Sequence, residues 1–456
     1  MFVMAFVSRA VAQEITPLPA TETVLLGRFA RGPLEVPLWV DEAGFHSTFG
    51  STNPASWPAE VQACQFFANG GAALHVIRVT DTGSLHDNLI GDSNALTGLN
   101  AVAPLSNTRL LIVPELALLN AQEFSSAFPI FHAFVNPRRI FMILDPPPGL
   151  PNAEAMIQWA GAALPLNAKN CAIYFPYLEF NLNGAIVTVA ASGAMAAIHA
   201  TSAAGQAPWN VPAGSAYPLN AANTTPIVSS AASDLLAANN INPIRNFAGT
   251  GIVPWSARTL DRQDLENRQL AAIRTRSWIA ASIQRSVAFA ATNHNATPLW
   301  TQLRAAAENF LHSLFQQGAF AGTTSSQAYF VRCDETTTTA GDIAQHRAIL
   351  LYGVAESRPA EFVITSLAVS TSDPERAASP SVLHLRPIDD QDLQIAYSTE
   401  PGFAYDLEFT SDLKTGDWHS TGTAAGDGAW RRPMVQILGS EKFFRLRIAP
   451  MPAKGN

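Results

Sequence analysis

Charged side chains are scarce in this sequence. They make up 14% of its 456 residues, and 36 acidic against 28 basic side chains leave a net charge of -8. Proteins that are held on nucleic acid by phosphate contacts carry basic surfaces, so this balance argues against that class. The only lysines are Lys169, Lys414, Lys442 and Lys454. A surface with few charges and arginine in place of lysine is typical of densely packed subunits, although GC-rich genomes produce the same bias.

Cysteines and long apolar runs are also few. Cys64, Cys171 and Cys333 are too far apart for a disulfide framework or a zinc site, and we interpret them as buried thiols in a reducing compartment. No stretch is long and apolar enough to span a bilayer, so we expect no membrane insertion. The apolar residues 1–7 allow two interpretations, a signal peptide without a basic start or an extended β-strand arm.

The short motifs of common active sites are missing. The sequence has no nucleophile elbow, no HExxH zinc motif, no P-loop and no GxGxxG phosphate turn. His75 and His312 have no evident carboxylate and nucleophile beside them. Asp334, Glu335 and Asp342 flank four threonines, and we interpret them as a solvated loop rather than a cation site. We therefore predict no catalytic residue, no metal and no cofactor, which favours a structural or interaction protein over an enzyme.

The sequence does contain alternating strands and helices between residues 22 and 180. Continuous apolar runs predict strands that are covered on both faces, and the segments between them predict helices. The predicted strands are 23–26, 36–40, 74–79, 110–113, 140–144 and 171–174, and the predicted helices are 41–49, 56–67, 121–134 and 154–164. This alternation is typical of an α/β layer.

The rest of the chain changes character twice. Residues 181–240 are poor in charge and predict long loops with one short helix at 193–200. Regular elements then return: a strand at 252–255, helices at 263–290 and 299–317, and strands at 328–333, 348–354 and 361–369. After a polar linker, five short strands predict a small β-sandwich: 382–385, 394–397, 404–409, 434–438 and 443–448.

A series of short motifs runs through the part before the linker. They are VLLGRFARGP (24–33), VPLWV (36–40), FHSTFG (45–50), ACQFFANGG (63–71), LHVIRV (74–79), INPIR (241–245), GIVPWSARTL (251–260), NHNATPLW (293–300), NFL (309–311), QGA (317–319), FVRCDETTTT (330–339) and RPAEF (358–362). In this order and spacing they resemble the tail sheath proteins of contractile phage tails and contractile injection systems. The resemblance covers residues 24–369, about three quarters of the chain.

The resemblance implies an α/β (α+β) sheath-type subunit of two domains with terminal β arms. It implies the following division: 1–21, N-terminal arm; 22–235, outer α/β domain; 236–370, inner C-terminal domain facing a tube; 371–381, linker; 382–456, a small all-β sandwich. The sandwich extends beyond the expected end of the family, and we expect it to decorate the outside of an assembly.

The resemblance also implies that terminal arms add strands to neighbouring subunits, because an unpaired strand edge satisfies its amide and carbonyl groups on another chain. The expected inter-subunit strand consists of Glu361, Phe362, Val363, Ile364, Thr365, Ser366, Leu367, Ala368 and Val369. The family's usual PGVYVEE-like start is missing, so an N-terminal arm would consist of Phe2, Val3, Met4, Ala5, Phe6 and Val7, or the start site is in error. The expected tube-facing residues of the helix at 299–317 are Arg304, Glu308, Gln316 and Gln317.

The function implied by the resemblance is structural. Hexameric rings would stack around an inner tube and contract without a cofactor, driving the tube through a target envelope. Expected partners are further copies of the chain, the inner tube protein, and baseplate and cap proteins. Assembly is expected in the bacterial cytoplasm, as part of a phage-like particle that can be released from the cell. Two alternatives stay open: an α/β enzyme with a carbohydrate-binding-like β module, and a sheath paralogue that caps or initiates the main sheath.

Overall fold

The computed structural model describes residues 14–202, 207–371, 384–387, 392–401, 403–410, 418–436 and 443–450. The chain divides into two compact units. The first unit is Leu18–Trp278, and the second unit is Ile279–Asn456 together with Met1–Pro17. The predicted arm Phe2–Val7 and the predicted linker after residue 371 lie outside the described residues.

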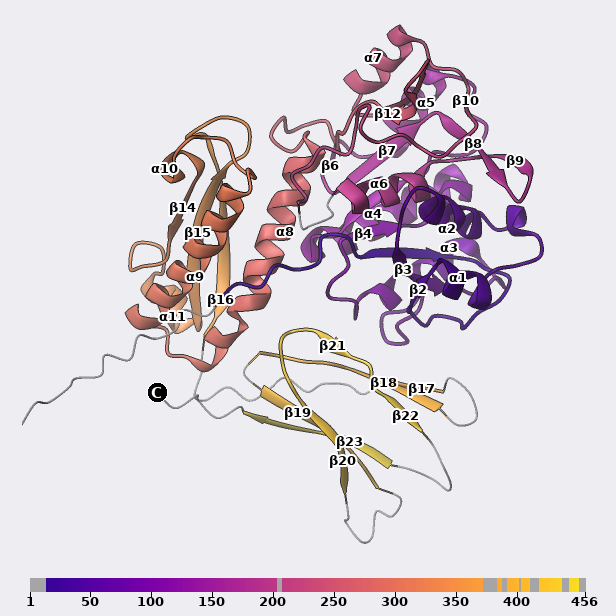
Figure 1. Cartoon of the computed structure of the whole chain (residues 1–456). Coiled ribbons are helices and arrows are strands. Elements are labelled where there is room, and N and C mark those ends of the chain that lie inside the picture. The colour runs from indigo at the N-terminus through magenta and orange to yellow at the C-terminus, as the bar shows by residue number, and fades with distance from the viewer. Residues whose placement is uncertain are drawn as a thin grey trace, which may run out of the picture. The chain divides into compact units, whose positions relative to one another are not determined.

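The first unit is built on an eight-stranded sheet with the order β12-β11-β7-β5-β4-β1-β3-β2 (Figure 1). The six inner strands run parallel, whereas the two edge strands run antiparallel to their neighbours. The strands are β1 (Thr23–Gly27), β2 (Leu38–Asp41), β3 (Ala73–Arg78), β4 (Leu110–Ile112), β5 (Phe141–Leu144), β7 (Cys171–Phe175), β11 (Asn242–Phe247) and β12 (Gly251–Pro254). The predicted α/β alternation is therefore confirmed.

Helices cover both faces of this sheet, as its continuous apolar strands require. Val24 and Leu26 of β1 belong to one core, and Leu25 between them belongs to the other. Side chains of α3, α4, α5 and α7 fill the first core, and those of α1, α2, α6 and α8 fill the second. The helices are α1 (Glu42–Thr48), α2 (Pro58–Ala68), α3 (Leu85–Ile90), α4 (Ala121–Arg138), α5 (Ala153–Ala163), α6 (Ser192–Ser202), α7 (Ser230–Ala238) and α8 (Leu270–Ser286).

The segment predicted as loops is more ordered than expected. β8 (Tyr177–Leu182) and β9 (Ala185–Val189) form a hairpin, and β10 (Asn223–Thr225) completes the sheet β10-β8-β9. Asn183 and Gly184 form its two-residue turn with positive φ angles of 53° and 88°, the geometry that favours Asn-Gly. The prediction of loops with a single helix was therefore wrong here.

The predicted helix at 263–290 was too long at both ends. Asp261 Oδ1 accepts hydrogen bonds from the amides of Gln263 and Asp264, at 3.0 Å each, and holds a turn in place of a helix. Strand β13 (Leu260–Asp261), just before this turn, pairs with β6 (Asn167–Ala168). After α8 the chain continues as the 3-10 helix η4 (Val287–Thr292).

The second unit contains a three-stranded antiparallel sheet, β14-β15-β16, on which α9 packs (Figure 1). Leu299, Leu303, Phe310, Leu311 and Leu314 are buried along one face of α9, and the helix predicted at 299–317 is confirmed. The elements here are α9 (Thr297–Gln316), α10 (Ser325–Ala328), β14 (Tyr329–Arg332), α11 (Ala340–Ala344), β15 (Arg347–Ala355) and β16 (Phe362–Ser370).

The C-terminal part of the second unit is all β. Two sheets enclose a core that includes Ile395, Tyr405 and Leu407. One sheet has the order β17-β18-β21, with β22 also paired to β18, and the other has the order β20-β19-β23. The strands are β17 (His384–Pro387), β18 (Asp392–Ser398), β19 (Phe403–Thr410), β20 (His419–Ala425), β21 (Trp430–Arg431), β22 (Met434–Gln436) and β23 (Phe443–Pro450). Strand β20 was not predicted from the sequence, because its largely exposed residues lack apolar alternation.

The first unit reaches further along the chain than residue 235, the predicted end of the outer domain. β11 pairs in parallel with β7, and β12 pairs with β11, so residues beyond 240 complete the large sheet. The assignment of an outer and an inner domain stays a prediction. Among the helices that the structure describes, none is long and apolar enough to cross a membrane.

Candidate assembly site

The place where doubly wound proteins usually bind a ligand is closed in this chain. The strand order changes direction between β1 and β4, and ligands commonly bind at the carboxyl ends of such strands. Glu115, at the start of the 3-10 helix η3 (Pro114–Leu118), fills this place, and its Oε1 accepts a hydrogen bond from the Arg28 amide at 3.0 Å. A Cβ atom at Gly27 would lie 2.4 Å from Glu115 Oε2 and 2.6 Å from the Ala59 Cβ. The chain's own atoms therefore occupy the position of a substrate.

Two buried carboxyl groups at this end of the sheet have structural partners. Burial raises the pKa of Glu115 to about 7, against the opposing effect of the Arg28 amide. Burial likewise raises the pKa of Asp145, which follows β5, to about 7. Asp145 accepts hydrogen bonds from the Ser192 amide at 3.0 Å and the Ser192 hydroxyl at 2.7 Å, at the start of α6. Through these contacts, Asp145 holds the start of α6 on the sheet.

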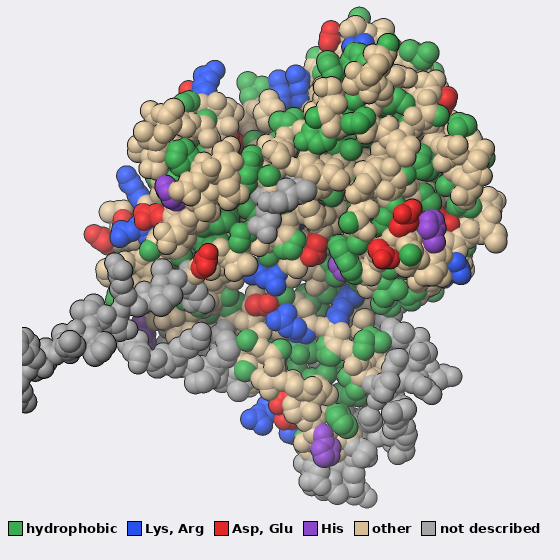
Figure 2. Space-filling model, in the orientation of Figure 1, with side chains coloured by type: hydrophobic (Ala, Val, Ile, Leu, Met, Phe, Trp, Pro, Cys, Tyr) green, Lys and Arg blue, Asp and Glu red, His purple; other side chains and the backbone are tan. Residues whose placement is uncertain are grey.

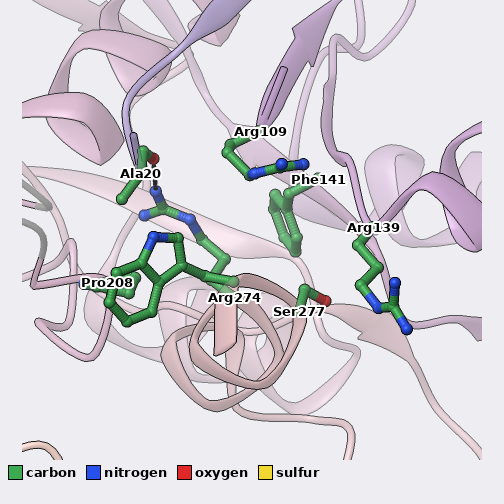
Figure 3. Close-up of a pocket in the computed structure, with 8 residues that line it drawn as sticks. Ala20, Arg109, Arg139, Phe141, Pro208, Arg274 and Ser277 are labelled. Carbon is green, nitrogen blue, oxygen red and sulfur yellow. Dashed lines mark hydrogen bonds between the residues drawn. The ribbon is translucent and has the colours of Figure 1, made fainter. Parts of the chain in front are cut away.

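Three arginines line a small pocket in the first unit, but the pocket has no room for a substrate (Figure 3). Its volume is about 10 Å³, which is the space of one water molecule. The buried Arg274 donates to the carbonyls of Ala20 and His199 at 3.3 Å each, and burial lowers its pKa to about 10. Trp278 Nε1 donates to the Leu18 carbonyl at 2.6 Å. Arg274 and Trp278 thus fix the segment before β1 along α8.

The acidic residues after β14 serve as local caps. Asp334 accepts a hydrogen bond from the Thr336 amide at 2.9 Å. Asp342 forms a capping box with Thr339 at the start of α11 and an ion pair with Arg347 at 2.8 Å. Within the described ranges, no group of His, Cys, Asp and Glu side chains is placed to hold a metal ion.

Strand β16 contains the predicted inter-subunit residues 361–369 from Phe362 onward. It pairs with β15 of its own chain over nine residues, from Arg347↔Ser370 to Ala355↔Phe362. It is the last strand of its sheet, and no other strand of the described chain pairs with its outer edge. The strand is thus part of its own subunit's sheet, and the exchange with a neighbour stays a prediction.

The register shows which residues of β16 point to the open edge. The Thr371 amide donates to the His346 carbonyl at 2.8 Å, so this opposite pair is hydrogen-bonded. Hydrogen-bonded pairs alternate in an antiparallel ladder, so Val363 and Thr365 bond to β15, whereas the backbone groups of Ile364 and Ser366 face outward. Ile364 is 59% exposed. No lysine, proline or bulge, the usual protection of an edge, occurs between Phe362 and Ser370.

The segment Thr16–Ala20 is anchored in two places. Within the second unit, the Thr16 amide donates to the Ser286 hydroxyl at 3.0 Å. Within the first unit, Leu18 and Ala20 are bound by Trp278 and Arg274 as described above. The residues before it, including Phe2–Val7, lie outside the described residues.

The four residues predicted to face a tube lie on the polar side of α9 and just after it. Glu308, Gln316 and Gln317 are exposed, and Arg304 is half-buried. Gln316 Nε2 lies 3.1 Å from His312 Nε2, and Gln317 Nε2 donates to the Ser313 carbonyl at 3.2 Å. Their contact with a tube stays a prediction.

Comparison with solved structures identifies the fold. The structure superposes on the helical sheath of the anti-feeding prophage in its contracted state with a TM-score of 0.63 and 22% identity, over 80% of this chain and 97% of that one. It also superposes on the contracted sheath complex of PVC, an extracellular contractile injection system, with a TM-score of 0.61 and 23% identity. This match covers 80% of this chain and 95% of that one. This chain has the fold of contractile sheath proteins. No protein-family model matches its sequence, and neither does any curated protein sequence.

A more distant sheath structure has the same fold. The sheath tail protein from Desulfitobacterium hafniense matches with a TM-score of 0.51 and 10% identity, over 81% of this chain and 100% of that one. The resemblance to tail sheath proteins and the predicted fold class are therefore confirmed at the level of the fold. About a fifth of this chain has no counterpart in these structures, and residues 372–456 make up a similar share.

Glu115→Gln should change the pH dependence of the stability of this sheath-like fold. Because burial raises the pKa of Glu115 from 4.5 to about 7, the folded chain keeps a proton that the unfolded chain has released. This contribution to stability is complete below about pH 4.5 and is lost as the pH rises through about 7. Relative to the variant, the wild type should lose up to about 3 kcal/mol of unfolding free energy by about pH 8.

Thermal and urea unfolding between about pH 5 and about pH 8 would measure the difference. Glu154→Gln is the control, because Glu154 is exposed in the first turn of α5. Parallel pH profiles for the wild type and Glu115→Gln would contradict the assignment.

Proposed function

We propose that this chain is the structural subunit of a contractile sheath. Copies form hexameric rings that stack helically around an inner tube, and contraction drives the tube through a target envelope. The observation that carries the proposal is the sheath fold over 80% of the chain, shared with two assemblies whose structures are of the contracted state. The closed position at Glu115 adds support, because it removes the usual ligand site of a doubly wound sheet.

The polymer is held together by strands that pair between copies. The open edge of β16 presents the amides and carbonyls of alternate residues, each of which gains about 1 kcal/mol net when it is paired. The apolar segment Phe2–Val7 of a neighbouring copy is the donor of an additional strand. A neighbour's β16 can also take the place of β16 on β15, because identical copies offer the same nine-residue register.

Contraction requires no cofactor in this account. The extended lattice is metastable, and the contracted lattice buries more surface between subunits. A small gain at each interface adds up over many copies, because packed interfaces switch between discrete arrangements. The paired strands keep neighbouring subunits connected while the subunits rotate and slide outward.

The remaining partners follow from the same proposal. The polar side of α9, with Arg304, Glu308, Gln316 and Gln317, faces the inner tube. Baseplate and cap proteins terminate the sheath at its two ends. The particle assembles in the bacterial cytoplasm and acts after release, without a catalytic step by this chain.

Proline substitutions on β16 separate pairing between copies from folding of the subunit. Ser366→Pro removes an amide that faces the open edge, where proline is tolerated, so the variant should fold but form no tubes or rings. Thr365→Pro removes an amide that bonds to β15 and should destabilise the second unit by about 3 kcal/mol or more. Thermal unfolding and electron microscopy of the purified full chain would measure both effects.

Ser366→Ala is the matched control and should assemble like the wild type, because it keeps the backbone amide. Tubes of wild-type length from Ser366→Pro would refute pairing at this edge. Short caps or single rings from the wild type, in place of long tubes, would favour the paralogue that caps or initiates a sheath.

The C-terminal β-sandwich decorates the outer surface of the sheath in this proposal. Residues 371–456 follow directly after β16, and a crowded tube-facing surface would leave no room for them. Deletion of these residues should leave assembly intact and reduce the outer diameter of the particles. Negative-stain images of both forms would measure the diameter, and an unchanged value would count against the placement.

A further inference from the structure

One face of the hairpin formed by β11 and β12 carries aromatic side chains beside an arginine. Arg245 and Phe247 lie on the same face of β11, because they are two residues apart. The Trp255 amide donates to the Pro243 carbonyl at 2.8 Å, so Trp255 continues β12 on that face. The opposite face of β11 packs into the buried core through Ile244. The three side chains thus lie on the side of the hairpin that faces away from this core.

Arg245, Phe247 and Trp255 form one connected stack, which we name the aromatic platform. The ring centroids of Phe247 and Trp255 are 4.6 Å apart, and the guanidinium carbon of Arg245 lies 4.7 Å from the centroid of the Phe247 ring. Arg245 Nη1 also donates to the Ser230 hydroxyl at 3.2 Å, and Trp255 is 47% exposed. Tryptophan and arginine are the side chains that most often dominate the energy of protein interfaces.

The positive charge of the aromatic platform has no acidic partner in the part of the chain that the structure describes. Arg245 is half-buried and forms no ion pair there. Asp234, one helical turn after Ser230 on α7, is exposed and forms no ion pair with it. A stacked guanidinium binds a carboxylate well, through parallel hydrogen bonds. The aromatic platform therefore fits a carboxylate that lies next to an apolar side chain.

A turn of the same unit offers this combination. Asp264, Leu265 and Glu266 are exposed at its tip, and we name them the acidic turn. Of the large hydrophobic side chains that are exposed in the described ranges, Leu265 alone has an acidic neighbour on each side in the sequence, and it is 70% exposed. Charged side chains are few on the face of the first unit that Figure 2 shows, so two carboxylates beside an exposed leucine are a specific feature of this chain.

Hydrogen bonds within the chain hold the acidic turn in shape. Asp264 Oδ1 accepts from the Glu266 amide at 2.9 Å, and Asp264 Oδ2 accepts from Asn267 Nδ2 at 2.8 Å. Arg276 Nη2 donates to the Glu266 carbonyl at 2.8 Å, so this arginine binds the backbone of the turn. Among the described residues, the Glu266 carboxylate forms no ion pair, either with Arg276 or with Arg268. Its charge is therefore available to a cation of another molecule.

We propose that the aromatic platform of one copy of this chain binds the acidic turn of the next copy. Leu265 packs on the exposed ring of Trp255, and the Glu266 carboxylate pairs with Arg245. Within one copy, no hydrogen bond or ion pair of the described residues joins the two surfaces. Because the surfaces differ, the contact repeats head to tail and generates rings or helices. The proposal rests on the proposed self-assembly of the chain, but not on strand pairing at β16.

Charge reversal at the two partners tests this contact in the full chain. Arg245→Glu and Glu266→Arg should each reduce the assembled fraction at least about tenfold, because each places like charges opposite one another. The double variant restores an opposite pair and should assemble to within about threefold of the wild type. Sedimentation and electron microscopy would measure the assembled fraction, and thermal unfolding would show that each variant folds.

Glu154→Arg is the matched control, because it changes the net charge as Glu266→Arg does, at an exposed position of α5. If the wild type assembles and both single variants assemble like this control, the inference is wrong and the sheath function stands. The same holds if the double variant assembles no better than the single variants. A wild type that never self-associates under any condition would overturn both.

Discussion

The structure depends on one physical constraint, the need of every backbone amide and carbonyl to find a partner. Inside the large sheet of the first unit, parallel strands and covering helices meet this need within one chain. At β9 and β16, each strand pairs on one side only among the strands that the structure describes, and neither strand contains a lysine, a proline or a bulge. Such edges are suited to a polymer, because a neighbouring copy would supply the missing partners.

The sparse charge of the sequence fits the same account. Identical acidic subunits repel one another, so contacts between them are best formed by uncharged surfaces, backbone hydrogen bonds and pairs of opposite charge. The buried Glu115 and Asp145 are exceptions, but each accepts a hydrogen bond from a backbone amide of its own subunit. The sheath fold thus uses its carboxyl-end edge for internal packing.

The sequence predicted the elements whose apolar pattern is set by local burial. The alternating strands and helices before residue 180, the helix α9 and the strand β16 are examples, and short motifs indicated the sheath fold. The β8–β9 hairpin was missed because it begins a segment rich in Ala, Ser, Asn and Gly, although Asn183-Gly184 is a turn signal. The places of Glu115 and Asp145 were not predictable, because they depend on which strand ends the topology brings together. The assembly role of residues 361–369 remains a prediction.

A cryo-electron microscopy map of the assembled particle, at a resolution that shows strands, tests the central claim most directly. We expect a strand from another copy in this subunit's β14-β15-β16 sheet, either beside β16 or in its place on β15. An assembled particle in which both chain ends fold back on their own subunit, with the edge of β16 exposed to solvent, would contradict it.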